Sequence, residues 1–235
     1  MTSPQPDGPD YQETFARLSA MFSDRLKTYG DGPECAEHRD RASQEQRMLH
    51  LCRVHDLREA KVLDFGCATG HLLTFLTREM GFRGEYVGYD ISADMVARAQ
   101  AIHGDRARFE MRNILRDGVG GEFDFTLVSG TFNDLAGDNW AWMRACLKTL
   151  FEHTRGAMSF NNLSTYVDYF DAHLFYVDPE DVFRFCKEEL SPLVTLRHDY
   201  QVKPDVVPFE FTVDVFQTPE ACRRRLVLGD GGRRG

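Results

Sequence analysis

The sequence predicts an α/β fold: a doubly wound, mostly parallel sheet of seven strands, with a helical cap ahead of it. After Lys61, strand-like and helix-like patterns alternate, which favours a parallel sheet covered on both faces by helices. The final two strand patterns have no crossover helix between them, so the last strand is expected to run antiparallel. Residues 11–57 show helical rather than alternating periodicity, which predicts the cap.

Composition limits the protein to a few classes. Its 235 residues are 42% hydrophobic and include 18 Phe, enough for one large domain with a substantial core. The net charge of −9 argues against a nucleic-acid partner, because phosphate binding normally requires basic surface. The 6 cysteines show no C-x-x-C pair, which indicates reduced thiols rather than disulfides or a zinc site.

The two ends of the chain are expected to lie outside the core, which we assign to residues 58–217. Residues 1–10 are polar and rich in Pro and Gly, so a flexible N-terminus without a signal segment is expected. Residues 218–235 resemble a solvated, disordered tail. No apolar run approaches the roughly 20 residues of a membrane span. These patterns predict a cytoplasmic protein with no membrane contact.

The cap region, residues 11–57, is expected to contain two or three helices. Phe15, Leu18 and Phe22 fall at helical spacing, and Met48, Leu51 and Val54 repeat the pattern. The run Tyr29-Gly30-Asp31-Gly32-Pro33 between them is a strong turn signal. The helices are therefore expected to lie ahead of the sheet, where they can cover a ligand site.

The elements of the sheet follow in chain order. Ser92 is expected to cap the second helix of this region, because its hydroxyl can accept a hydrogen bond from a free backbone N–H group. The predicted strands are Lys61–Cys67, Glu85–Ile91, Arg108–Ile114, Asp124–Thr131 and Ala157–Asn161, and the predicted helices are Gly70–Met80, Ser92–His103 and Trp140–His153.

The last third of the sequence has a different character. Leu163–Asp178 is aromatic-rich and irregular. A helix is expected from Pro179, a favourable first helical residue, to about Leu190. Val194–Tyr200 and Phe209–Gln217 then predict the antiparallel strand pair.

The segment Lys61–Leu72 is the clearest candidate for ligand binding. A short apolar strand ends in Asp64, and a glycine-bearing turn then opens a helix. Such a unit presents free backbone N–H groups and the positive end of a helix to a ligand. From this geometry alone the ligand could be a nucleotide, a dinucleotide or S-adenosylmethionine.

Four motifs in order resemble those of class I S-adenosylmethionine-dependent methyltransferases, which implies a Rossmann-like sheet. They are Val62-Leu63-Asp64-Phe65-Gly66-Cys67-Ala68-Thr69-Gly70, Tyr86-Val87-Gly88-Tyr89-Asp90-Ile91-Ser92, Phe109-Glu110-Met111-Arg112-Asn113-Ile114 and Phe123-Asp124-Phe125-Thr126-Leu127-Val128-Ser129-Gly130-Thr131-Phe132. The first departs from the family pattern at Ala68, where the family usually has glycine, and the resemblance covers about residues 62–216.

The resemblance implies S-adenosylmethionine as the cofactor. Asp90 would hold the ribose hydroxyls, Asp64 would lie near the methionine ammonium, and Asn113 would lie near the adenine amine. The full set of expected cofactor contacts is Tyr29, Arg47, Asp64, Gly66, Cys67, Ala68, Gly70, Asp90, Ile91, Met95, Asn113, Ile114 and Ser129.

The acceptor site is expected beyond the later strands. His198 is the first candidate for a general base because imidazole titrates near neutrality, with Asp199 beside it and His173 as second choice. The alternative is that His198 and Asp199 only tie a strand end to a loop. The expected substrate contacts are Phe132, Asn133, Asn161, Tyr166 and Tyr176, and the histidines expected on the surface are His38, His50, His55, His103 and His153.

The absence of an Asn-Pro-Pro-Tyr-type run after Val128 argues against nucleobase amine methylation, and no trio of acids suggests a metal site. A small-molecule acceptor with an N, O or C nucleophile is therefore expected, and the sequence leaves a homodimer open. Two other functions remain. A nicotinamide-dependent oxidoreductase is disfavoured because the turn lacks G-x-G-x-x-G spacing. A non-catalytic cofactor-binding partner subunit is disfavoured because the donor motifs are intact.

Overall fold

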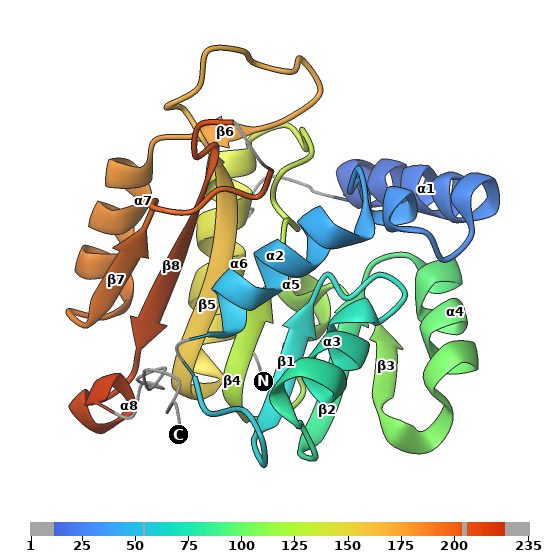
Figure 1. Ribbon diagram of the computed structural model, residues 1–235, viewed down its shortest axis with the longest axis horizontal. Helices are drawn as coiled ribbons and strands as arrows, with labels where there is room; N and C mark the ends of the chain where they lie inside the picture. Colours follow the sequence, from blue (N-terminus) through green and yellow to red (C-terminus); the bar gives the residue numbers. More distant parts are fainter. Residues whose placement is uncertain (1–11, 54, 204–205, 224–235) are drawn as a thin grey trace, which may run out of the picture.

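The computed structural model describes residues 12–53, 55–203 and 206–223, and it contains one central sheet with helices on both faces (Figure 1). The strands are β1 (Lys61–Phe65), β2 (Glu85–Asp90), β3 (Arg108–Met111), β4 (Phe123–Val128), β5 (Thr154–Ser164), β6 (Tyr176–Val177), β7 (Val194–Arg197) and β8 (Glu210–Phe216). The main path through the sheet is β3-β2-β1-β4-β5-β8-β7, and β6 pairs with β5 off this path.

The sheet confirms the predicted topology. β1 pairs in parallel with β2 and with β4, so the strand order reverses between β1 and β4. Only β8, among the described strands of the main path, runs against its neighbours, pairing antiparallel with both β5 and β7. This reversal point opens a crevice at the carboxyl ends of the strands, where α/β sheets bind ligands.

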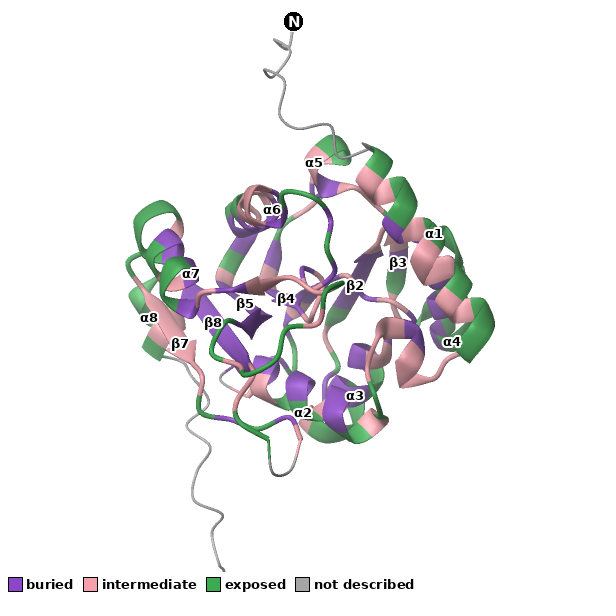
Figure 2. Cartoon of the chain, turned by 90° about the horizontal axis from the view of Figure 1, so that it is seen from above, coloured by how far each residue is buried: buried purple, intermediate pink, exposed green. Residues whose placement is uncertain are grey.

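The helices lie in two groups (Figure 2). They are α1 (Gln12–Tyr29), α2 (Arg41–Cys52), α3 (His71–Met80), α4 (Ala93–His103), α5 (Ile114–Asp117), α6 (Asn139–Glu152), α7 (Pro179–Phe185) and α8 (Pro219–Arg223), with short helical turns η1 (Pro33–Ala36), η2 (Gly104–Arg106) and η3 (Cys186–Leu190). Seen from above, α2 and α3 lie on one side of the sheet and α5 and α6 on the other.

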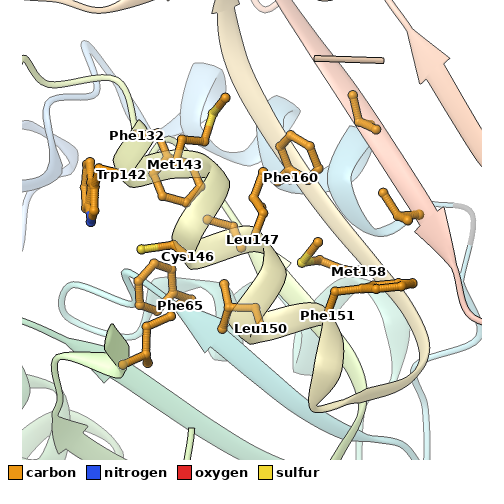
Figure 3. Packing of buried hydrophobic residues seen from close by; sticks show 14 of the residues in the cluster. Phe65, Phe132, Trp142, Met143, Cys146, Leu147, Leu150, Phe151, Met158 and Phe160 are labelled. Carbon is orange, nitrogen blue, oxygen red and sulfur yellow. The ribbon is translucent and has the colours of Figure 1, made fainter. Parts of the chain in front are cut away.

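Each face of the sheet has its own apolar core, because successive residues of a strand point to opposite faces. Val62 of β1 packs with α2 and α3, whereas Leu63 packs with α6. The α6 face contains Phe132, Trp142 and Leu147, shown with their neighbours in Figure 3. A strand buried on both sides needs a continuous apolar run, which explains the Val62-Leu63 pattern.

Several boundaries differ from the sequence-based expectation. β5 continues through Ser164 because it pairs with β8 along its length and with β6 at its end. The predicted third strand stops at Met111, and Asn113 instead caps α5 by accepting from Leu115 N at 3.1 Å. Ser92 caps α4 as predicted, accepting from Met95 N at 3.3 Å.

The predicted flexible N-terminus lies outside the described residues, and the predicted C-terminal tail and cap lie partly outside them. Residues 1–11 and 224–235, and Val54, are not described. Within the predicted tail, Pro219–Arg223 forms α8.

Two histidines expected on the surface are buried, which corrects that prediction. His55 is 3% exposed and its Nε2 lies 2.6 Å from Ser159 Oγ. Ser159 in turn donates to Asp214 at 2.6 Å, and Asp214 pairs with Arg197 at 3.1 Å. This network fastens the loop after α2 to β5, β8 and β7. His103 is 4% exposed and stacks on Phe109.

Truncation of Leu147 should destabilise the protein strongly. Its side chain is 0% exposed in the α6 core, so Leu147→Ala is expected to lower the free energy of unfolding by about 2–5 kcal/mol. Urea denaturation followed by circular dichroism measures this. The matched control is Leu49→Ala on α2, where the side chain is 40% exposed and the change should be roughly 0.5 kcal/mol or less. Equal losses in the two variants would contradict the assignment of the core.

Candidate active site

A cavity of about 810 Å³ opens at the carboxyl ends of β1, β2 and β4, within the range of small-molecule sites. The cap contributes α1, η1 and α2 to its wall, and the segments 165–175 and 206–209 close the other end. The sequence-predicted residues in the wall are Arg47, Asp64, Gly66, Cys67, Ala68, Asp90, Ile91, Met95, Asn113, Ile114, Ser129, Asn133 and Tyr176.

The turn after β1 has a backbone that few side chains tolerate. Gly66 has φ +83°, and a Cβ added there would lie 2.1 Å from Thr131 Oγ1. Ala68 also has positive φ, 46°, in the region that favours glycine. This explains why the related motif usually carries glycine at the position of Ala68. Gly66 N and Cys67 N both donate to Tyr89 O, at 2.8 and 3.0 Å, and so join the turn to β2.

Asp90 holds this turn through its side chain. Its Oδ2 accepts from Ala68 N at 2.9 Å, and its Oδ1 accepts from Ser92 N at 2.9 Å. Burial raises the pKa of Asp90, and the backbone donors Ser92 and Ala68 oppose that rise. The carboxylate lines the cavity and, as a group with several acceptor lone pairs, can bind further hydroxyl donors.

Asp64, at the end of β1, carries a strongly perturbed carboxyl group. It is 2% exposed and accepts a hydrogen bond from Tyr86 Oη. Burial raises its pKa to about 7; the Tyr86 hydrogen bond opposes this and the nearby Asp90 charge adds to it. A buried carboxyl of this kind is positioned to pair with a cation.

Four buried polar atoms of wall residues have no hydrogen-bond partner among the described residues. Two are oxygens, Ser129 Oγ, just after β4, and Asn133 Oδ1, and the other two are Arg25 Nε and Trp142 Nε1. Buried polar atoms are normally hydrogen-bonded, so their position at the cavity points to a bound ligand or water.

The cap closes the apolar end of the cavity. Phe15, Leu18 and Phe22 of α1 lie in the same wall as Ile91 and Met95. The sequence predicts that the cap can cover a ligand site, but it does not name these three side chains as contacts; their apolar helical spacing was the available signal. The slot they form suits a flat aromatic group.

Arg47 is tied to the sheet rather than free in the cavity. It forms a buried ion pair with Glu210 at 2.6 Å. Burial raises the pKa of Glu210, and Arg47 opposes this rise. Glu210 also accepts from Asn161 Nδ2 at 3.5 Å, and Asn161 Oδ1 accepts from Gly130 N at 2.7 Å. α2, β8, β5 and the loop after β4 are therefore connected by one chain of polar contacts.

Several predicted site residues lie outside the cavity wall. Asn161 is 2% exposed within β5, and Phe132 is 0% exposed against Trp142. Neither is placed to touch an acceptor, because both side chains are used inside the protein. Gly70 instead begins α3, and an added Cβ there would meet His103. Tyr29 is 49% exposed at the end of α1.

Tyr166, His198 and Asp199 are also outside the wall. Tyr166 is 57% exposed and its hydroxyl lies 3.2 Å from Glu180. His198 Nε2 lies 3.2 Å from Pro208 O, and Asp199 lies 3.9 Å from Arg53. The geometry matches the alternative considered for this pair, in which it ties a strand end to a loop. A catalytic role for His198 and Asp199 stays a prediction that this geometry does not support.

The cavity contains titratable groups that sequence analysis missed. Burial raises the pKa of Asp134 to about 8, and the hydrogen bond that its protonated carboxyl donates to Glu37 adds to the rise. Glu37 has a left-handed backbone with φ 60° and pairs with Arg25 at 3.1 Å. Burial lowers the pKa of His38 to about 3, helped by the charge of Arg47. These side chains come from irregular segments, one just after η1 and one after β4, which carry no periodic signal.

In the part of the chain that the structure describes, no group of three His, Cys, Asp or Glu residues is arranged to hold a metal ion. No described helix is long and apolar enough to cross a membrane.

Comparison with known proteins identifies the family. A protein-family model described as a methyltransferase domain matches residues 56–163. Rv1506c of Mycobacterium tuberculosis (strain ATCC 25618 / H37Rv), named as a candidate methyltransferase, is 34% identical over 156 residues, which are 64% of this chain and 89% of that protein.

Solved structures share the fold. The magnesium protoporphyrin IX methyltransferase of Synechocystis PCC 6803 with bound S-adenosylmethionine matches with a TM-score of 0.63 and 13% identity, over 92% of this chain and 100% of that one. The plantazolicin methyltransferase BpumL with S-adenosylhomocysteine matches with a TM-score of 0.57 and 12% identity, over 88% and 99%. Neither an oxidoreductase nor a non-catalytic subunit fits these matches. The chain belongs to the class I S-adenosylmethionine-dependent methyltransferases.

Proposed function

We propose that this protein transfers the methyl group of S-adenosylmethionine to a nucleophilic atom of a small-molecule acceptor. The observation that carries the proposal is the position of Asp90. Its carboxylate ends β2, holds the left-handed turn at Ala68 and lines a cavity of about 810 Å³. A diol is the ligand group that such an acceptor-only carboxylate binds well, and the cofactor's ribose supplies one.

The donor would extend along the reversal point of the sheet. Adenine suits the apolar slot of Ile91, Met95 and the α1 side chains, beside Asn113. The methionine ammonium would pair with Asp64, and its carboxylate would meet the backbone N–H groups after Gly66. Ser129 Oγ, which has no partner among the described residues, lies in the cavity wall. It would form a hydrogen bond with the methionine moiety of the donor.

The acceptor would occupy the remaining space beneath η1 and the segment 165–175. The two structural relatives described above are named for the acceptors magnesium protoporphyrin IX and plantazolicin. The cavity here combines aromatic and charged side chains, as small-molecule sites do.

The reaction would be an in-line displacement. The acceptor atom attacks the methyl carbon, the carbon–sulfur bond breaks, and its electron pair returns to sulfur as S-adenosylhomocysteine forms. Most of the rate acceleration would come from holding donor and acceptor at attack distance in a site from which the cap excludes water.

S-adenosylhomocysteine should stabilise the folded protein. A ligand present at 100 times its dissociation constant adds about 2.7 kcal/mol to the free energy of unfolding, which raises the melting temperature measurably. Differential scanning fluorimetry with S-adenosylhomocysteine and NAD compares the two. A rise with NAD and none with S-adenosylhomocysteine would contradict the proposed cofactor.

Asp90→Ala should weaken S-adenosylhomocysteine binding by roughly tenfold or more, because it removes hydrogen bonds to a charged group worth about 1.5–3 kcal/mol. Isothermal titration calorimetry measures the affinity, and circular dichroism checks that the variant is folded. Asp105→Ala, an exposed aspartate of η2 outside the cavity, is the matched control and should bind normally. Equal affinities in the two variants would remove Asp90 from the site.

Cofactor binding should strengthen as pH rises through about 7. In the free protein the pKa of Asp64 is raised to about 7, so the carboxyl is largely protonated below that pH. Pairing with an ammonium requires the charged form, and binding below pH 7 must therefore release a proton. Calorimetry in buffers of different ionisation enthalpy counts the protons released. In Asp64→Asn the affinity for the cofactor should depend less on pH. An unchanged pH dependence would show that another group takes up the proton.

A further inference from the structure

The acceptor half of the cavity contains a histidine–aspartate pair that the mechanism above does not use. His173 and Asp171 lie between β5 and β6 at the open mouth of the cavity, which both line, and their side chains are 61% and 40% exposed. His173 Nδ1 lies 2.6 Å from Asp171 Oδ1. A carboxylate at Nδ1 favours the tautomer that carries its proton there, which leaves Nε2 as a proton acceptor. Among the described residues, none hydrogen-bonds to Nε2.

The pair is fixed to the loop that follows β4. Leu135 N donates to His173 O at 3.1 Å, and Phe175 N donates to Asn133 O at 2.7 Å. Asp134 and Leu174 form a bridge between these two bonds. Asn133 N in turn donates to Gly130 O at 3.1 Å. Backbone hydrogen bonds therefore connect the segment that contains His173 to the loop at the carboxyl end of β4, where the proposed donor lies.

The other histidines in the cavity wall are less suited to accept a proton. Burial lowers the pKa of His38 to about 3, so its imidazole is neutral and weakly basic. Burial also lowers the pKa of His71, whose Nε2 already lies 3.0 Å from Glu45. Of the described histidines of the wall, His71 and His173 each have a carboxylate at one nitrogen, and burial lowers the pKa of His71.

The surroundings of His173 are aromatic. Tyr176 and Phe209 also line the cavity, as do the exposed side chains of Tyr169 and Val207. Tyr176 Oη accepts from Asp171 N at 3.2 Å, which places this ring beside the pair. Aromatic and apolar walls favour a flat ring in the acceptor.

We propose that His173 is the general base of the reaction, that Asp171 positions it, and that the acceptor is a phenolic hydroxyl group. This inference rests on the proposed function. As the phenol oxygen attacks the sulfonium methyl, Nε2 takes the hydroxyl proton. The oxygen–carbon bond forms, the carbon–sulfur bond breaks, and sulfur keeps the electron pair. Asp171 stabilises the resulting imidazolium, which then loses its proton to solvent.

The test pairs matched acceptors with matched variants. Wild-type protein is incubated with S-adenosylmethionine and one acceptor at a time, and products are identified by mass spectrometry. The phenols are naphthol, hydroxycoumarin and nitrophenol, and the matched acceptors are the corresponding amines. Methylation of the phenols is expected. In His173→Gln, kcat with naphthol should fall by about 10²–10⁴-fold, the usual contribution of general base catalysis. In Asp171→Asn it should fall less, on the order of tenfold.

Two readouts separate a base from a structural residue. The fall in His173→Gln should be smaller with nitrophenol, which ionises more readily and needs the base less. The pH dependence of turnover in His173→Gln should also differ in shape from that of wild type, because the variant lacks the imidazole. Other acids that line the cavity can also change the pH dependence of turnover; they are Asp134, Glu37 and Asp168. The variant Asp134→Asn measures the contribution of Asp134, whose pKa is raised to about 8.

His153→Gln is the matched control, because His153 Nδ1 pairs with Glu122 at 3.1 Å beside the start of β4, at the opposite end of the sheet. Its turnover should equal that of wild type. Unchanged turnover in His173→Gln would overturn the base, and methylation of amines alone or of no phenol would overturn the acceptor class. Calorimetry with S-adenosylhomocysteine is run on every variant. If the wild-type protein does not bind S-adenosylhomocysteine, the proposed function itself is wrong.

Discussion

The hydrogen bond from Ala68 N to Asp90 Oδ2, 2.9 Å long, is the constraint on which the rest of the site depends. It joins the turn after β1 to the end of β2, on one side of the crevice between β1 and β4. The turn needs such support because Gly66 and Ala68 both have positive φ, and for alanine that conformation costs free energy. A carboxylate that already accepts two backbone N–H groups is also fixed in orientation before any ligand arrives. Pre-organisation of this kind lowers the entropic cost of binding.

The cap is held to this frame at two places of different character. α2 is fixed by buried polar contacts, Arg47 with Glu210 and, through the following loop, His55 with Ser159. α1 is held by different contacts: Leu18 is buried in the core on the α6 side of the sheet, Thr14 Oγ1 donates to Ala136 O at 3.2 Å, and Ser23 Oγ lies 3.1 Å from Ser92 Oγ. The cap is therefore held by buried charges at α2 and chiefly by apolar packing and neutral hydrogen bonds at α1.

Most of the residues that the sequence assigns to the donor line the cavity, whereas most of those that it assigns to the acceptor do not. Asp64, Gly66 and Asp90 belong to strand–turn–helix units whose geometry is local, so their spacing determines where they lie. Asn161 was expected at a strand end, but pairing with β8 and β6 extends β5 beyond it, and such pairing is not visible in the strand's own residues. His198 follows β7, which the strand order puts at the sheet edge, beyond β8. His173 reaches the cavity through the bridge between Asp134 and Leu174, which joins two irregular segments without periodicity.

Ser92 connects the ligand site to the cap in a way that bears on the order of events during turnover. Its N–H group donates to Asp90, while its hydroxyl caps α4 and contacts Ser23 of α1. The residues just after η1 supply Glu37 and His38 to the cavity wall. In the proposed function, a donor held at Asp90 would also be linked to α1 through Ser92, so donor binding and the position of the cap would be coupled. Such coupling predicts ordered kinetics, in which the donor binds first and S-adenosylhomocysteine leaves last.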